Sequence, residues 1–336
     1  MRHNWFGLRK LLRHKRVVVL MYHRVADLET DPWELAVSPT NFEAQVAYLT
    51  RKYKVISVEE LSHQLQQGKI TADSVCLTFD DGYRDNVETA KPILEKYNCP
   101  AAFFIATKYL ADQQPYWWDE LERILLHSPK LSPVLEVCIN GEPLHFQLED
   151  NGWLSETQRQ HHKKWTWEKE PPTQRCAAYF SIWEKLKPLP YPQIQASLIQ
   201  LKRFVLEASP STTSYFPMTL DQLKDFARNP LFTIGLHTHT HPALKYHSRE
   251  MQLTELNENR RQLETLLDRP IDSISYPYGI YDDNTLSVVD ELKQKVAFTT
   301  NPRIVTHQSS SFKLGRIPVQ NQDAPQFAKT ISTYFN

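Results

Sequence analysis

The stretch from Val75 to Gly82 constrains the fold more than any other part of the chain. It reads Val-Cys-Leu-Thr-Phe-Asp-Asp-Gly, so a mostly apolar run leads directly into two adjacent carboxylates and a glycine. Such a run is typical of a strand buried on both faces of a parallel sheet. Asp80 and Asp81 repel each other when both are ionised, and a bound cation would remove that repulsion. The competing interpretation is a strand that ends in a solvated turn.

A histidine-rich segment follows a second strand-like run far downstream. Residues 232–236, Phe-Thr-Ile-Gly-Leu, precede His237, His239 and His241, which alternate with threonines and end at a proline. His237 and His241 converge if the segment makes one helical turn, whereas His237 and His239 share a side if it stays extended. Two histidines with Asp81 would form a metal site that leaves positions open for water and substrate. We expect one divalent ion, Zn²⁺ before Co²⁺ or Ni²⁺.

These motifs resemble those of the polysaccharide deacetylase family, carbohydrate esterases of the chitooligosaccharide deacetylase type. The resemblance rests on five segments: Thr78–Gly82, His237-Thr-x-x-His241-Pro, residues 17–25 as a first strand with its Tyr-His exit, residues 101–105, and Tyr276-Pro-Tyr-Gly. It covers about residues 17–110 and 230–320. It implies an α/β fold, a distorted (β/α) barrel.

The resemblance also implies roles for individual residues. Asp81, His237 and His241 would hold the metal, and Asp80 would be the general base that takes a proton from a water molecule. The backbone N–H of Tyr278 would face the acyl oxygen. The reaction would remove an acyl group, N-acetyl before O-acetyl, from a sugar of a polysaccharide or glycan precursor.

The chain departs from the family pattern in two places. The third family motif begins with an arginine that pairs with the base, and Ser275 stands at that position here. Arg316 is the candidate replacement. The late family motif that ends in Leu-x-His is not recognisable, so the general acid has no assigned residue. His23, after the first strand, and His307, in a late polar loop, are the candidates, with His23 preferred as a pocket residue.

The order of the predicted elements divides the chain into a barrel and an insertion. Strand-like and helix-like segments alternate over residues 17–111 and 226–336, which predicts a mostly parallel barrel. In such a barrel the catalytic residues gather at the carboxyl ends of the strands. Residues 112–225 interrupt the alternation, and we interpret them as an inserted α+β subdomain. A hairpin is expected at Asn140-Gly141, and one of the helices predicted in the insertion covers about residues 192–207.

The insertion is rich in tryptophan, which suggests contacts to sugar rings. Trp118 and Asp119 follow closely on the strand at 101–105, so we predict that they bind substrate, together with Tyr276 of the third motif. The competing interpretation is that most of these tryptophans form the core of the insertion itself.

The composition is that of an ordinary globular protein. The 336 residues include 39 basic and 39 acidic side chains, so the formal net charge is zero. Nucleic-acid binding needs a basic footprint, which this balance does not provide. We therefore predict a carbohydrate partner and no nucleic acid. The cysteines show no close spacing, and we interpret them as reduced thiols in a reducing compartment.

Residues 1–16 form a basic segment in which leucines recur at near-helical spacing. One interpretation is an amphipathic helix that makes weak contact with an anionic membrane surface. The favoured one is a helix that packs its apolar side on the body. The apolar run at 17–22 is too short to span a bilayer and lacks a cleavage site. We therefore expect a cytoplasmic protein, with peripheral contact at the inner membrane face as the alternative.

Three functions stay open at this point. The favoured one is a carbohydrate deacetylase. The second is a hydrolase of non-sugar C–N bonds, such as cyclic amides, on the same fold. The third is a non-catalytic glycan-binding relative, which the two departures from the family pattern favour. The intact set of Asp80, Asp81, His237 and His241 argues against that third function.

Overall fold

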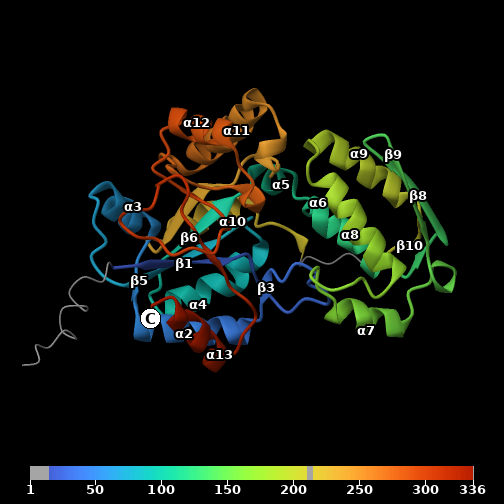
Figure 1. Cartoon of the computed structure of the whole chain (residues 1–336), viewed down its shortest axis with the longest axis horizontal. Coiled ribbons are helices and arrows are strands. Elements are labelled where there is room, and N and C mark those ends of the chain that lie inside the picture. Colours follow the sequence, from blue (N-terminus) through green and yellow to red (C-terminus); the bar gives the residue numbers. More distant parts are fainter. Residues whose placement is uncertain (1–14, 210–214, 336) are drawn as a thin grey trace, which may run out of the picture.

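The computed structural model describes residues 15–209 and 215–335, and its centre is a parallel sheet (Figure 1). Seven strands follow the order β13-β12-β11-β6-β5-β1-β14, and β4 pairs beside β5. Their bounds are β1 Val17–Tyr22, β4 Lys54–Val55, β5 Ser74–Phe79, β6 Ala101–Ile105, β11 Phe232–Leu236, β12 Ser273–Ser275, β13 Val296–Phe298 and β14 Ile317–Pro318.

One segment of chain connects the two ends of this sheet. Leu314 forms a parallel bridge with Phe298 of β13. Three residues later, Ile317 of β14 pairs with Leu20 of β1. The sheet therefore curls into a distorted barrel, as the sequence predicts.

The strands are buried on both faces because apolar side chains occupy both sets of alternate positions. Val17, Val19, Cys76, Phe104 and Phe298 belong to one buried cluster. Their neighbours along the strands belong to a second cluster, which includes residues of the surrounding helices. The apolar runs seen in the sequence thus serve two separate cores.

Helices and short helical turns surround the strands. Figure 1 shows α2, α4 and α13 together on one side of the strands, with α11 and α12 on the opposite side. The bounds are α2 Pro39–Lys52, α3 Val58–Gln66, η1 Asn86–Ala90, α4 Lys91–Lys96, α5 Thr107–Asp112, α10 Leu220–Phe226, η5 Leu244–Tyr246, α11 Arg249–Leu267, η6 Pro277–Gly279, α12 Asp283–Glu291 and α13 Ala324–Thr333.

The chain between β6 and β11 holds the elements of the insertion, drawn mainly in green beside the barrel (Figure 1). They are α6 Trp117–Glu122, η2 Arg123–His127, β7 Lys130–Leu131, β8 Val134–Ile139, β9 Glu142–Gln147, η3 Asp150–Gly152, α7 Glu156–Lys164, α8 Gln174–Leu186, α9 Tyr191–Lys202 and β10 Val205–Glu207. Most of their buried apolar side chains form a cluster of their own. The boundaries at 112 and 225 stay a prediction.

Two local predictions for the insertion have different outcomes. The hairpin is confirmed, since Asn140 and Gly141 have φ values of 50° and 81° between β8 and β9. The single helix over 192–207 is wrong, because α9 ends at Lys202 and the chain then forms β10, which pairs with β7. Leu206 of this strand is exposed, so the apolar residues that suggested a continued helix lie on an edge strand instead.

The predicted amphipathic segment falls almost wholly on residues 1–14, which lie outside the described residues. Within the described residues, no helix combines the length and the apolar character that crossing a bilayer requires. A small parallel pair, β2 Arg24–Val25 with β3 Ala36–Val37, joins β1 to α2. The loop inside this pair carries Trp33, which reaches the functional site.

Candidate active site

The register of the sheet brings three chain segments to one edge. Tyr22 at the end of β1 pairs with Phe79 at the end of β5. Ile105 at the end of β6 pairs with Leu236 at the end of β11. The residues that follow β1, β5 and β11 therefore meet at the carboxyl edge of the barrel, where parallel barrels hold their active sites.

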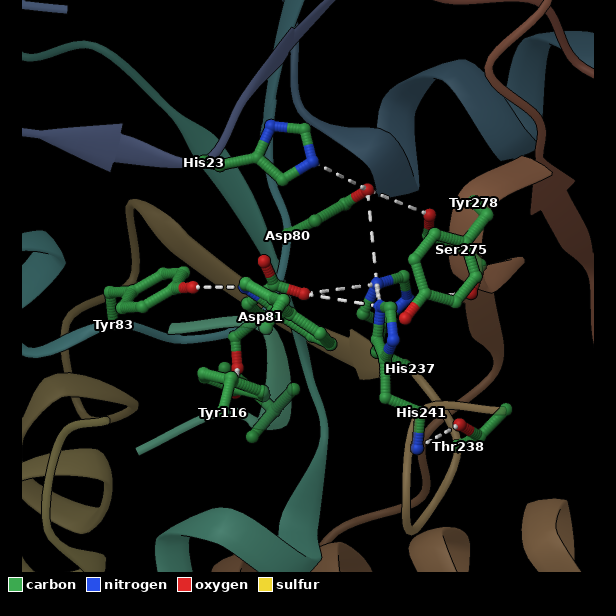
Figure 2. Close-up of polar contacts among 12 residues, drawn as sticks. His23, Asp80, Asp81, Tyr83, Tyr116, His237, Thr238, His241, Ser275 and Tyr278 are labelled. Carbon is green, nitrogen blue, oxygen red and sulfur yellow. Dashed lines mark hydrogen bonds and ion pairs between the residues drawn. The ribbon is translucent and has the colours of Figure 1, made fainter. Parts of the chain in front are cut away.

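The two aspartates are held by an unusual backbone turn. Asp80 continues the strand, and its N–H donates to the carbonyl oxygen of Tyr22. Asp81 then has a φ of 75°, a conformation rare for a residue with a side chain, and Gly82 has a φ of 86°. A Cβ on Gly82 would lie 2.7 Å from a methyl carbon of Ile105. The Tyr116 hydroxyl donates to the carbonyl oxygen of Asp81 and supports the turn from below (Figure 2).

The histidine segment adopts neither a helical turn nor an extended strand. Thr238 and His241 both have positive φ values, 63° and 60°, and the N–H of His241 donates to Thr238 Oγ1 at 3.0 Å. This tight loop brings His237 and His241 together. His239 points elsewhere, with its Nδ1 3.0 Å from Thr107 Oγ1.

Asp81, His237 and His241 converge on one point (Figure 2). Asp81 Oδ1 lies 3.4 Å from His237 Nε2 and 3.3 Å from His241 Nε2, and the two nitrogens are 3.1 Å apart. His237 Nδ1 is 2.8 Å from the carbonyl oxygen of Ser275. A carbonyl only accepts, so Nδ1 carries the proton, and with Nε2 deprotonated the ring would direct a lone pair to the site.

These three residues fit a divalent metal. Asp81 Oδ1 is buried without a hydrogen-bond partner. A buried carboxylate oxygen without a donor is costly, and a cation would satisfy it. Two imidazole nitrogens and one carboxylate oxygen are ligands that suit zinc and similar ions, with positions left for water and substrate.

Asp80 is bound on its other side by a buried cation. Arg316 donates to both carboxylate oxygens, through Nη1 at 2.7 Å and Nη2 at 2.6 Å. Ser275 Oγ donates to Asp80 Oδ2 at 3.1 Å and accepts from Arg316 at 2.8 Å. Arg316 also contacts Thr78 Oγ1 and the carbonyl oxygen of Thr299. The arginine expected at position 275 is thus replaced in space by Arg316, together with the small side chain of Ser275.

The electrostatics keep both aspartates ionised. Burial alone would raise the pKa of Asp80, but the charges of Arg316 and His237 and the hydrogen bonds from Arg316 hold it below its usual value. Burial would also raise the pKa of Asp81, and contacts with His237 and His241 lower it strongly instead. Both carboxylates are thereby ionised at neutral pH, as a general base and a metal ligand would have to be.

His23 is the neighbour of Asp80 on the side of β1. Its Nε2 lies 4.0 Å from Asp80 Oδ2, and the ring lines the pocket described below. Burial lowers the pKa of His23, although the charges of Asp81 and Asp80 oppose this effect. His307, the other candidate acid, is not among the residues that line the pocket.

A pocket of about 360 Å³ opens over the aspartates and histidines. Aromatic side chains form much of its wall: Trp33, Trp118, Trp167, Trp183 and Tyr278. The Trp118 ring lies 4.7 Å from that of His241, and the Tyr278 ring lies 4.6 Å from it. Tyr278 has a φ of 56° and joins Asp81, Thr238 and His241 as a residue of the site with positive φ. The pocket thus combines a polar floor with a wall suited to the apolar face of a sugar ring.

Two predicted substrate contacts lie away from the pocket. Asp119 is buried beneath it and accepts a hydrogen bond of 2.8 Å from the Tyr83 hydroxyl, which in turn accepts from Trp118 Nε1 at 2.8 Å. Tyr276 is buried, and its hydroxyl donates to the carbonyl oxygen of Phe312. Neither lines the pocket, because each points into a core, so the prediction that they bind substrate is not supported.

Trp33 and Lys187 are among the pocket residues that no sequence motif indicates. Trp33 comes from the loop after the first strand, and its ring lies 4.0 Å from that of Trp183. Its position after a barrel strand was a usable signal, since loops at the carboxyl edge build such sites. Lys187 follows α8 and carried no motif.

Trp183 is both buried in the core of the insertion and part of the pocket wall, so the two interpretations of the tryptophans are not exclusive.

Parts of the chain are similar in sequence to known proteins. The family described as polysaccharide deacetylase matches residues 67–127 and 197–297. YxkH of Bacillus subtilis is 30% identical over 115 residues, and poly-beta-1,6-N-acetyl-D-glucosamine N-deacetylase of Staphylococcus aureus is 34% identical over 117 residues. Each alignment covers 34% of this chain, which spans 40% of the length of either relative.

A solved structure supports the fold over almost the whole chain. Streptococcus pyogenes deacetylase PplD, in complex with acetate, aligns with a TM-score of 0.58 and 20% identity, over 95% of this chain and 98% of that one. At 20% identity this likeness shows the fold. Over residues 67–127 and 197–297 the sequence is that of the polysaccharide deacetylase family, and a long insertion lies between β6 and β11.

Proposed function

We propose that this chain is a metal-dependent hydrolase that removes an acyl group from a sugar, with N-acetyl as the favoured acyl group. One observation carries the proposal. The ligand atoms of Asp81, His237 and His241 lie within 4.8 Å of one another, beside an Asp80 that Arg316 holds ionised. The family match and the aromatic pocket support a carbohydrate substrate.

Asp81, His237 and His241 would hold the metal, and Zn²⁺ is the ion we favour for this donor set. When bound, such an ion supplies Lewis-acid polarisation of the acyl oxygen and lowers the pKa of water. The hydrogen bond from His237 Nδ1 to the Ser275 carbonyl oxygen fixes the orientation of that ring. In other metal centres a hydrogen bond from the ring nitrogen that does not bind the metal orients the histidine ligand in the same way.

The side chains around the ligands would move the protons. Asp80 would take a proton from the attacking water, since Arg316 and Ser275 fix its carboxylate in place. His23 lines the pocket next to Asp80 and would pass the proton that Asp80 has taken from water on to the departing amine. The family resemblance assigns the Tyr278 N–H to the acyl oxygen, and the Tyr278 ring forms part of the wall.

Acetate release from a substrate panel tests this function. The zinc-loaded protein would be given N-acetylglucosamine oligosaccharides, an O-acetylated sugar and a cyclic amide, each with and without a chelator. We expect acetate from the N-acetylated sugars and its loss after chelation. Ring opening of the cyclic amide without acetate from any sugar would instead identify a hydrolase of non-sugar C–N bonds.

A further inference from the structure

The pocket contains one cation that the proposed reaction does not use. Lys187 lines the pocket beside the tryptophans and follows the last residue of α8. Its ammonium lies 4.7 Å from the centre of the Trp183 ring. A positive charge is favoured at the C-terminal end of a helix, so its position helps to keep Lys187 charged.

Lys187 differs from the neighbouring lysine on the same helix. Lys185 forms an ion pair with Glu142 on the outer surface of the insertion. Within the described residues, no ion pair joins Lys187 to a carboxylate, and burial lowers its pKa against the opposing charge of Glu184. A partly buried ammonium against an aromatic wall has lost water that an anion could replace.

The position of this charge relative to the metal ligands bears on its role. The Trp183 ring lies 6.0 Å from the Tyr278 ring, and the Tyr278 ring lies 4.6 Å from His241. Lys187 lines the same pocket as the proposed metal ligands and is connected to them through contacting aromatic rings. A substrate in this pocket could therefore contact both.

The two carboxylates of the pocket already have positively charged or imidazole partners. Asp80 is paired with Arg316, and Asp81 faces the two histidines. The wall near Lys187 is formed by Trp33, Trp167 and Trp183, which offer no negative charge. A substrate that brings its own anion would be bound there more tightly than a neutral one, since charged hydrogen bonds contribute more than neutral ones.

We propose that Lys187 is a specificity-determining residue that selects saccharides carrying an anionic group, a phosphate or a carboxylate, next to the acylated sugar. This inference rests on the proposed function. The aromatic wall would hold the sugar ring, and Lys187 would hold the anion at its far side. A phosphate linking the sugar to a carrier and an acidic sugar substituent share this chemistry.

Three matched probes test the proposal by calorimetric binding to the zinc-loaded protein. They are an N-acetylglucosamine disaccharide as the neutral methyl glycoside, the same disaccharide with a methyl phosphate diester, and the same disaccharide with a carboxylate substituent. We expect at least ~10-fold tighter binding of one or both anionic probes, the scale of a charged hydrogen bond. Comparing the two anionic probes distinguishes a phosphate link from an acidic sugar.

Two variants give the proposal its control. Lys187→Met keeps an unbranched apolar stem against Trp183 and removes the charge, and it should abolish the preference for the anionic probes. Lys185→Met removes a lysine two positions away and should retain the preference. Equal affinity of the wild type for charged and neutral probes, or a preference that survives Lys187→Met, would overturn the proposal.

Acetate release from the same probes separates this inference from the function on which it rests. Charge-selective binding without acetate release would leave the role of Lys187 in place and contradict the hydrolase. Acetate release at equal rates from neutral and anionic probes, with equal affinities, would support the hydrolase and reject the role of Lys187. Absence of binding by every probe would reject the role of Lys187 as well.

Discussion

Arg316 and Asp80 lie 236 positions apart in the chain and form two parallel hydrogen bonds inside the barrel, at 2.7 and 2.6 Å. Both side chains are buried, and Arg316 is fully shielded from solvent. The pair joins β14 to the end of β5, so the strand that closes the barrel also orients the proposed base. Fold and chemistry are therefore coupled at this contact.

Replacing the arginine should destabilise the protein. Arg316→Met leaves a buried, unpaired carboxylate at Asp80, and breaking such a pair costs about 3–5 kcal/mol. Urea unfolding of the two proteins would measure the change in the free energy of unfolding.

A double variant provides the control for this prediction. In an Asp80→Asn background the carboxylate is absent. The decrease in the free energy of unfolding caused by Arg316→Met should therefore be at least ~1 kcal/mol smaller than in the wild type. Equal costs in the two backgrounds would show that the arginine acts through packing and not through Asp80.

Asp80→Asn should keep the metal and lose turnover. The substitution preserves the shape of the side chain and leaves the three proposed ligands intact, but an amide cannot take a proton from water. We expect acetate release to fall at least ~100-fold, the usual scale for loss of a general base. Metal content measured on the same preparation should match that of the wild type. Turnover within a few-fold of the wild type would remove Asp80 from this role.

Gly82→Ala should cost more stability than the same change at Gly68. Both glycines have positive φ, which costs a residue with a side chain about 1–2 kcal/mol. A Cβ at Gly82 would also lie 2.7 Å from Ile105, whereas a Cβ at Gly68 would have no neighbouring heavy atom within 4 Å. Overpacking adds about 1–3 kcal/mol at Gly82. Thermal or urea unfolding of both variants checks the order, and an equal loss would show that the turn after Asp81 adjusts freely.

His162 should make stability depend on pH. Burial lowers its pKa from the ordinary 6.5 to about 4, despite a hydrogen bond to the Leu126 carbonyl oxygen. The unfolded chain therefore binds a proton between pH 6.5 and 4 that the folded protein does not. Stability from this group is present above pH 6.5 and is lost as the pH falls to 4. The loss is about 3 kcal/mol, at about 1.36 kcal/mol per pKa unit.

The neighbouring histidine is the matched control for this pH dependence. His162→Gln removes the titrating group, so the free energy of unfolding should vary less between pH 6.5 and 4 than in the wild type. His161→Gln changes an exposed ring on the same helix and should leave the wild-type dependence in place. Identical pH profiles for the wild type and His162→Gln would contradict the prediction.

The barrel and the clustering of Asp81 with His237 and His241 could be predicted from the sequence because their signals are local. An apolar run that ends in Asp80 and Asp81 indicates both a buried strand and its carboxyl end. His237 and His241 follow a second such run. Parallel pairing then brings the two ends together, so a short motif predicts a long-range contact.

Other contacts could not be predicted, because they depend on how distant segments pack. The pairing of Arg316 with Asp80 was predicted only through the family pattern, because Ser275 leaves the base without its usual arginine, and no local pattern around Arg316 indicates it. Asp119 follows Trp118 directly, yet it points into the core while Trp118 faces the pocket, since neighbours on a helix point in different directions. Lys187 has no motif at all, and only the path of α8 brings it to the pocket.

Metal content of the purified protein tests the central claim most directly. We would measure it by elemental analysis for the wild type, for the double variant His237→Ala/His241→Ala, and for His239→Ala, whose ring contacts Thr107 outside the site. The account predicts about one divalent ion per chain in the wild type and in His239→Ala, and none in the double variant, with circular dichroism unchanged. Absence of metal from the wild type after addition of Zn²⁺ or Co²⁺, or full retention in the double variant, would contradict it.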